Sequence, residues 1–371
     1  MRHGLNVGCA YNLEMESMKT ITTMQQRLRQ PLQLAVWGLC ACVLVLGSHV
    51  ATAQDVTKAG TVAATFLKIG AGPRATAMGE AFVATANDLT AAYWNPAGLA
   101  WLAGGQVTLS HTDWIADFQH QFGAAALNLG DAGSVAVSLI MFRAPDQEVT
   151  TVESPNGTGE YFSYQDVVVG ISYSRKLTDR FSFGATVKYV SETIYRINAS
   201  AVAFDLGTIY TIPGTTLRIG MTLLNFGTKM QFTGDNLERS IDVDPATTGE
   251  TDRATAFLKT EQWDIPLGFK VALAYDFTFG NASRLTLAAD AVNPNDNREN
   301  LNVGGELAYE EFLFFRAGFR GINSDQREGG LSYGGGVELP LAGGMRASVD
   351  YAFSDLGRLK SIHRFGVSLK F

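Results

Sequence analysis

Two glycine-containing motifs have the spacing of catalytic or nucleotide-binding sites. Residues 330–334 (GLSYG) match G-x-S-x-G, where a serine nucleophile stands on a sharp turn between a strand and a helix. The residues around Ser332 alternate as in a strand, however, and no helix follows it. Residues 70–75 (GAGPRA) match the dinucleotide fingerprint on paper, but no βαβ unit surrounds them. Neither motif has the surrounding secondary structure that catalysis or nucleotide binding requires, so the sequence predicts no enzyme.

Metal-binding and thiol chemistry are equally poorly supported. The histidines beyond residue 53 are scattered, without the spacing of metal ligands, and they are His111, His120 and His363. His111 and His120 remain the one argument for a hydrolase, because hydrolases of outer membranes pair histidine with serine or aspartate. An acidic stretch at 235–252 fits a solvated external loop better than a calcium site. We therefore expect no catalytic residue, no cofactor and no metal.

The N-terminal segment has the order of a secretory signal. A positively charged region precedes the apolar run 32–46, and Ala51-Thr52-Ala53 then forms a small-x-small cleavage site before Gln54. At fifteen residues the run is shorter than the roughly 20 that a spanning helix needs. We expect a signal peptide over residues 1–53, in which 1–17 add nothing and Met18 is the better start. A lipoprotein at Cys42 is the weaker alternative, because the apolar run continues past that residue.

Cleavage there would leave an exported chain without a thiol. All three cysteines, Cys9, Cys40 and Cys42, precede the site, which excludes disulfides and cysteine nucleophiles from the mature protein. The net charge of −7 argues against a broad nucleic-acid-binding face. The 39 glycines and 22 phenylalanines are the composition of curved sheets, where glycine relieves crowding and rings cover the outer surface.

From residue 105 onward, polar and apolar residues alternate with a period of two. In 345–353 (MRASVDYAF), apolar residues occupy the odd positions. Many such runs have the nine to thirteen residues of a tilted spanning strand. The polar face carries full charges in mid-strand, which suit a wet lumen and not a dry core; these are Lys188, Asp205, Arg218, Asp290, Glu306, Arg316 and Asp350. The pattern predicts an all-β transmembrane antiparallel barrel, whose fourteen strands are expected at 105–117, 119–129, 133–143, 163–175, 181–196, 200–212, 215–227, 263–277, 283–292, 300–310, 312–321, 330–339, 344–354 and 362–371.

The connections between these strands give a second indication. Those after the even-numbered strands are short, whereas those after strands 3, 7, 9 and 11 are longer, as in outer-membrane barrels with short periplasmic turns. The tight connection after strand 1 departs from this rule. We expect both termini in the periplasm of a Gram-negative type of envelope. The last strand keeps its alternation to an aromatic end and resembles the assembly signal of outer-membrane barrels, through Phe365, Val367, Leu369 and Phe371.

A segment of different character precedes the barrel. Residues 54–103 are rich in alanine and glycine, alternate little, and are too few for a core of their own. We expect them to form an N-terminal helical and irregular plug inside the lumen of a barrel spanning 104–371. The plug contains a turn at Gly70, Gly72, Pro73 and Arg74 and a rigid elbow at Asn95, Pro96, Ala97 and Gly98.

These plug residues carry a family resemblance. Residues 66–81 (FLKIGAGPRATAMGEA) followed by 93–99 (YWNPAGL) resemble the PorV/PorQ family, which belongs to the wider group of FadL-like fourteen-stranded outer-membrane barrels. The elbow is similar to the NPA motif of the FadL plug. The resemblance covers nearly all of the mature chain, most sharply 66–99, and implies the fold predicted above.

The resemblance implies two functions of different classes. PorV-like barrels act in type IX secretion, which implies secreted cargo proteins and secretion-system components as partners, bound on surface loops such as 228–262. FadL-like barrels instead move hydrophobic small molecules past the plug, and Phe66, Leu67, Ile69, Phe82 and Val83 would then line a pocket or only pack the plug. A porin-like barrel is disfavoured by the plug. In each case we expect outer-membrane lipid and the barrel-assembly machinery as partners, and no nucleic acid.

Overall fold

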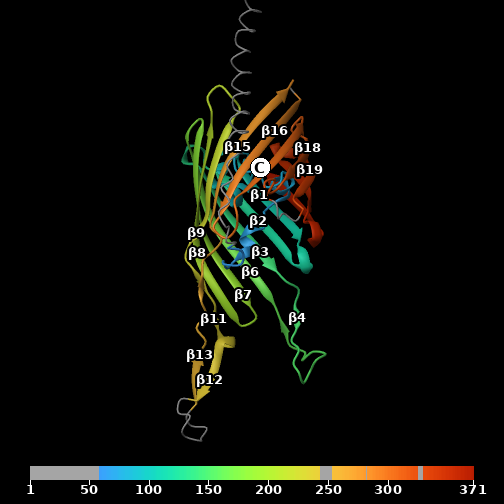
Figure 1. The fold of residues 1–371 in the computed structure, drawn as a ribbon. Helices are drawn as coiled ribbons and strands as arrows, with labels where there is room; N and C mark the ends of the chain where they lie inside the picture. The colour runs from blue at the N-terminus through green and yellow to red at the C-terminus, as the bar shows by residue number, and fades with distance from the viewer. Residues whose placement is uncertain (1–57, 243–252, 281, 325–328) are drawn as a thin grey trace, which may run out of the picture. The chain divides into compact units, whose positions relative to one another are not determined.

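A computed structural model describes residues 58–242, 253–280, 282–324 and 329–371. The predicted signal peptide and part of the acidic stretch lie outside these ranges. Fourteen strands form the wall of the barrel (Figure 1): β1 (Gly105–Asp113), β2 (Gln119–Asn128), β3 (Ser134–Arg143), β6 (Tyr164–Thr178), β7 (Phe181–Ile194), β8 (Ile197–Thr211), β9 (Arg218–Gly227), β15 (Gly268–Phe279), β16 (Ser283–Pro294), β17 (Asn300–Tyr309), β18 (Leu313–Phe319), β19 (Leu331–Pro340), β20 (Arg346–Asp355) and β21 (Ser361–Lys370).

The wall is an antiparallel sheet closed on itself. Each strand pairs with its neighbours in the chain, β8 pairs with β9, β9 with β15, and the last strand β21 pairs with the first, β1. Closure leaves no free edge in the wall. The predicted fourteen strands are thereby confirmed, including the tight first hairpin, in which Asp113 of β1 faces Gln119 of β2. No helix in the described part of the chain is long and apolar enough to cross a membrane.

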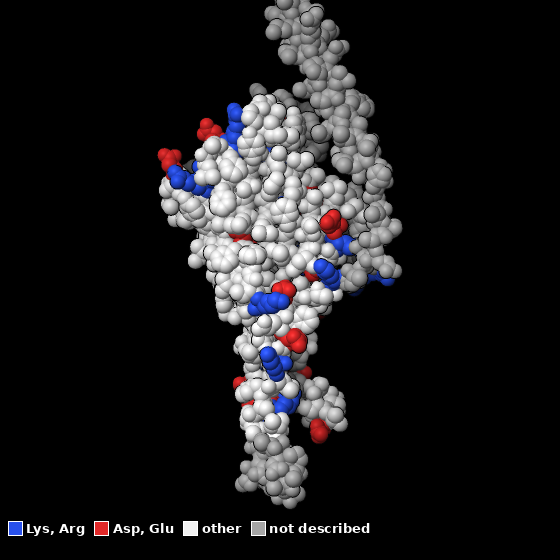
Figure 2. All heavy atoms as spheres, turned by 60° about the vertical axis from the view of Figure 1, so that its left-hand side comes forward, with Lys and Arg blue, Asp and Glu red and all other residues white. Residues whose placement is uncertain are grey.

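Alternation gives the wall two different faces. In β3 the side chains of Val135, Val137 and Leu139 are exposed, whereas Ser134, Ala136 and Ser138 are buried. Large apolar side chains cover the outside of the barrel in this way, among them Leu109, Ile171, Phe204, Leu273 and Val367. Figure 2 shows a broad area of the wall without charged side chains, with Lys, Arg, Asp and Glu gathered toward its ends. Such a band fits contact with lipid.

The segment before β1 lies against the inner face of the wall as a plug. Its short helical turns are η1 (Thr65–Lys68), α2 (Pro73–Ala77), α3 (Ala91–Trp94) and η2 (Pro96–Trp101). They contact strands from several sides of the barrel, α2 against β18 to β21 and η2 against β3 and β6 to β8. Nearly all plug side chains from Phe66 to Leu102 are buried. The plug therefore lies inside the lumen, as the sequence predicts.

The longest excursions leave the same end of the barrel (Figure 1). Between β9 and β15 lie β10 (Met230–Gln231), β11 (Thr233–Gly234), η5 (Asp235–Leu237), β12 (Glu238–Asp242), β13 (Arg253–Phe257) and β14 (Gln262–Trp263). The hairpin β12–β13 pairs only with itself, and a smaller hairpin joins β4 (Gln147–Glu148) to β5 (Tyr161–Phe162). The remaining short turns are η3 (Ile115–Asp117), η4 (Gly130–Ala132), η7 (Ala342–Gly344) and η8 (Gly357–Leu359).

Candidate functional site

The predicted elbow fixes one side of the plug to the wall. Asn95 is fully buried; its Oδ1 accepts the amide of Ala97 at 3.1 Å, and its Nδ2 donates to Val83 O at 2.9 Å and Thr208 O at 3.2 Å. Pro96 begins η2 directly after it, where the fixed φ of proline suits the first residue of a helical turn. The Asn95 side chain thus caps η2 and joins it both to the plug and to β8.

Wall glycines let the plug approach the wall closely, and at two of these places the glycines form a pair. A Cβ on Gly184 would stand 2.3 Å from the carbonyl carbon of Pro96, and one on Gly207 would stand 2.0 Å from Asn95 Oδ1. Gly184 and Gly207 face each other across β7 and β8. On the other side of the barrel, Gly304 and Gly318 form a second such pair, against the backbone of the Met78–Gly79 dipeptide. Only glycine leaves room for so close an approach.

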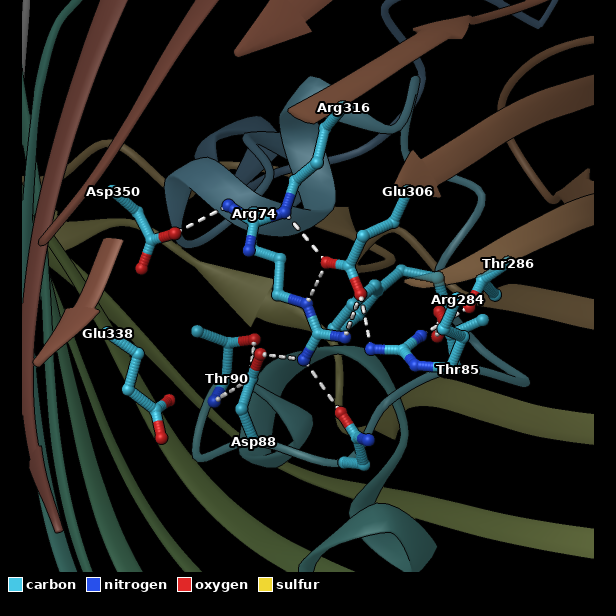
Figure 3. Close-up of polar contacts among 12 residues, drawn as sticks. Arg74, Thr85, Asp88, Thr90, Arg284, Thr286, Glu306, Arg316, Glu338 and Asp350 are labelled. Carbon is cyan, nitrogen blue, oxygen red and sulfur yellow. Dashed lines mark hydrogen bonds and ion pairs between the residues drawn. The ribbon is translucent and has the colours of Figure 1, made fainter. Parts of the chain in front are cut away.

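The predicted turn supplies the main polar contact between plug and wall. Arg74 donates to both oxygens of Glu306 on β17, from Nε at 2.8 Å and Nη2 at 3.0 Å (Figure 3). Its Nη1 donates to Asp88 at 2.9 Å and to Asn87 at 2.7 Å. Burial lowers the pKa of Arg74, but the carboxylates of Glu306 and Asp88 more than offset this, and the pKa lies well above its ordinary value.

Two wall arginines complete this network. Arg316 donates to Glu306 at 2.7 Å and to Asp350 at 2.5 Å, and Arg284 lies 3.3 Å from Glu306. We call Arg74, Glu306, Arg316, Arg284 and Asp350 the Arg74 latch. Glu306 is almost fully buried, so its negative charge depends on these cations. The latch joins three of the wall charges predicted to face the lumen to one plug residue.

The other predicted lumen charges also face inward, and each has at least one polar partner. Lys188 lies 2.8 Å from Asp205, and Arg218 lies 2.7 Å from Asp276. Asp290 accepts the amides of Phe82 and Val83, each at 3.0 Å. Asp290 thus joins the plug to the wall, whereas the other two ion pairs join neighbouring wall strands.

Two cavities remain beside the plug. One of about 260 Å³ adjoins the Arg74 latch near β20 and β21. The other, of about 620 Å³, lies among the plug, the ends of β9 and β15 to β17, and the segments that precede β15 and follow β18. Of the five apolar plug residues considered for a pocket, only Leu67 lines the larger cavity. Phe66 stacks on Phe142 and Phe82 packs on Trp94, so these two pack the plug.

The residues considered for catalysis lie on different strands of the wall. Ser332 lies on β19, where its hydroxyl donates to Ser354 at 3.1 Å. His111 lies 3.0 Å from Asp113 on the exposed part of β1, and His363 bonds to Tyr351. Across 58–242, 253–280, 282–324 and 329–371, no group of three or more His, Cys, Asp or Glu side chains could hold a metal.

Comparison with known proteins joins this architecture to a family. The family described as type IX secretion system protein PorV matches residues 51–241, which include the plug with its elbow and Arg74 and the wall through β9. The chain belongs to the PorV family. Its barrel and family make it an outer-membrane protein. No curated protein matches the chain.

Solved structures similar to this PorV-family protein agree with its fold. The toluene transporter TodX of P. putida is 13% identical, with a TM-score of 0.51 over 81% of this chain and 96% of its own. The monoaromatic hydrocarbon channel CymD is also 13% identical, with a TM-score of 0.50 over 81% and 96% of the two chains. At such identity the likeness concerns the fold alone.

Sequence reasoning identified both plug motifs but missed their partners. It placed Glu306 and Arg316 on the inner face without connecting them to Arg74, and it did not use the wall glycines Gly184, Gly207, Gly304 and Gly318. Glycine at inward positions of two adjoining strands was a readable signal, because glycine inside a strand often marks the close approach of another backbone.

Proposed function

We propose that this protein serves type IX secretion as a plugged outer-membrane barrel that binds secreted cargo and other secretion components at its long-loop end. The observation that carries the proposal is the family match over residues 51–241. The plug supports it, because a lumen filled and held by the Arg74 latch leaves no open path for a folded protein. The role is then one of binding at the surface, not of conduction.

The hairpin β12–β13 is the proposed partner-binding element. It leaves the barrel beyond β11 and presents exposed apolar side chains, among them Ile241, Phe257 and Leu258. Its two strands pair only with each other among the residues described, so both of its outer edges offer unpaired backbone groups. Such edges, together with apolar side chains, are the features by which an extended segment adds to a sheet.

The excursion that carries the hairpin is attached separately from it. Met230 is buried and pairs with Trp263, and Thr233 pairs with Asn198 of β8. Removal of residues 238–257 alone would therefore spare these contacts. A matched control is removal of 150–159 from the loop between β4 and β5, which leaves the same end of the barrel.

The test measures cargo in the culture medium and barrel in the outer membrane. We expect loss of 238–257 to abolish or strongly reduce cargo secretion, whereas loss of 150–159 has little effect and both variants assemble normally. Crosslinking from native membranes should recover cargo and a partner with the intact chain and with the variant that lacks 150–159, but not with the variant that lacks 238–257. Unchanged secretion without 238–257 would refute the assignment of this hairpin.

The alternative function is transport of hydrophobic molecules, and the fold shared with TodX and CymD supports it. The larger cavity weakens it, because Lys68, Glu80, Lys270 and Arg320 line that space. Charged side chains disfavour a hydrocarbon, which cannot replace their water. Binding of toluene or a fatty acid by the purified protein would restore this alternative.

Assembly into the membrane is a further part of the proposal. The aromatic-ended strand β21 closes the barrel against β1, and the Phe371 amide donates to Gly105 O at 2.9 Å. We propose that Phe365, Val367, Leu369 and Phe371 are recognised by the barrel-assembly machinery and that both termini lie in the periplasm.

A further inference from the structure

The 620 Å³ cavity at the end of the barrel that carries the long excursions contains charged groups that the secretion role does not use. Its charged lining consists of Lys68, Lys270, Arg298, Arg320, Glu80, Asp296 and Glu299. A space of this size holds a small solute, and its polar lining distinguishes it from the apolar pockets that bind most ligands.

Three carboxylates in this region already have donors of their own. Glu80 is paired with Arg320 at 3.1 Å, and Asp296 with Lys68 at 2.5 Å. Asp290, which lies behind the lining, accepts two backbone amides at 3.0 Å. None of these three carboxylates lies within ion-pair distance of Lys270.

Lys270, unlike Lys68, has no carboxylate partner among the described residues. Within the described part of the chain its ammonium makes no ion pair and no hydrogen bond, and it lies 4.7 Å from the centre of the Trp94 ring. The ring attracts a cation but accepts none of its three protons in a normal hydrogen bond. The side chain comes from the inner face of β15, is half-buried and lines the cavity.

A second donor faces the same space. Asn302 on β17 is buried, and its Oδ1 accepts the amide of Gly321 at 2.9 Å. That bond identifies which atom of the amide is the oxygen. The two protons of Nδ2 have no partner among the described residues, and Asn302 lines the cavity. An ammonium and an amide NH₂ together are donors suited to an oxyanion.

We propose that this cavity binds a small oxyanion, the sulfate, phosphate or carboxylate group of a solute, through Lys270 and Asn302. The cavity opens among the segments that flank the strand ends, so the anion reaches it without displacement of the plug. The ligand class differs from that of the neutral hydrocarbons named for TodX and CymD, and the inference does not depend on the role in secretion.

The test is calorimetric titration of the purified full-length barrel in detergent with sodium sulfate, phosphate and acetate, against chloride at equal ionic strength. We expect saturable binding by the native chain, about tenfold or more weaker in Lys270→Met, and largely kept in Lys270→Arg. Methionine preserves the apolar stem, so the variant should fold; Lys270→Gln is the second variant if it does not. Lys229→Met is the matched control, because Lys229 is an exposed lysine outside the cavity, 3.4 Å from Asp264.

Fluorescence supplies a readout that a structural role would not move. An anion that moves the Lys270 ammonium away from the indole ring should change the fluorescence emission of Trp94. The midpoint of this change should equal that of the calorimetric titration, and the change should be absent in Trp94→Phe. Binding of sulfate and phosphate alone would assign an inorganic ligand, and binding of acetate an organic carboxylate. Absence of saturable binding for all three anions, or equal binding by Lys270→Met, would overturn the proposal.

Discussion

Replacement of Arg74 by methionine should release the plug while the wall stays folded. Arg74 is the one plug residue of the Arg74 latch, and it makes two hydrogen bonds to Glu306, one to Asp88 and one to Asn87. Methionine keeps the volume of the stem but none of these bonds. The closed wall, by contrast, keeps every strand pairing, because no ladder hydrogen bond involves Arg74.

The magnitude follows from the burial of Glu306. Loss of one partner of a buried ion pair costs about 3–5 kcal/mol, and the lower end applies here because Arg316 at 2.7 Å and Arg284 at 3.3 Å still face Glu306. About 3 kcal/mol corresponds to a roughly 100-fold increase in the population with the plug released. Arg346→Met is the matched control: Arg346 borders the same small cavity, but its side chain is 58% exposed and pairs with Glu338 at 3.2 Å, so that pair contributes at most about 1 kcal/mol.

Two assays report on release of the plug. Hydrogen exchange should show the amides of residues 64–102 losing protection in Arg74→Met by about the same factor, with strand amides unchanged. In planar bilayers the same variant should show frequent openings, and Arg346→Met should behave as the native chain. If Arg74→Met kept full protection of the plug and a closed lumen, the latch would not be what holds the plug.

Two other predictions concern the elbow and the long-loop end. Gly184→Ala should lower the free energy of unfolding by about 1–3 kcal/mol, because its Cβ would meet Pro96 at 2.3 Å, whereas Gly268→Ala, with nothing within 4 Å, should have little effect in the same urea titration. At the long-loop end, a hydrogen bond from the Tyr195 hydroxyl lowers the pKa of Glu160. The contact is therefore fully present above about pH 4.5, the ordinary pKa of this group, and is lost as pH falls through the lowered value. Exchange of the Tyr195 amide, which donates to Ser163 O at 3.0 Å, should then accelerate, and Glu160→Gln should abolish this pH dependence.

The strands were predictable because the bilayer imposes one rule on all of them. A residue that faces lipid must be apolar, and its neighbour faces the interior, so alternation identifies both the strand and its orientation. The segment 181–196, for example, was expected as a strand and appears as β7 over Phe181–Ile194. The charged face was also assigned correctly to the interior, since Asp205, Asp290 and Glu306 are all buried there.

The environment of those charges could not be predicted by the same rule. Alternation states that Glu306 points inward but not what it meets, and its partner Arg74 lies 232 residues away in the chain. A plug of short turns has no period from which its position could be computed. The sequence therefore predicts that the plug and the charges share the lumen, but not which of them meet.

The paired wall glycines are the sequence signal that relates the wall strands to the position of the plug. A strand interior gains nothing from glycine on its own, since the residue lacks a side chain to pack and loses more entropy on folding than any other. Gly184 with Gly207, and Gly304 with Gly318, are nevertheless adjoining inward positions. Gly184, Gly304 and Gly318 lie against plug backbone, and Gly207 lies against the Asn95 side chain. Because a glycine pair at inward positions leaves room for another segment to approach closely, strand register together with the sequence indicates that the plug approaches β7–β8 and β17–β18.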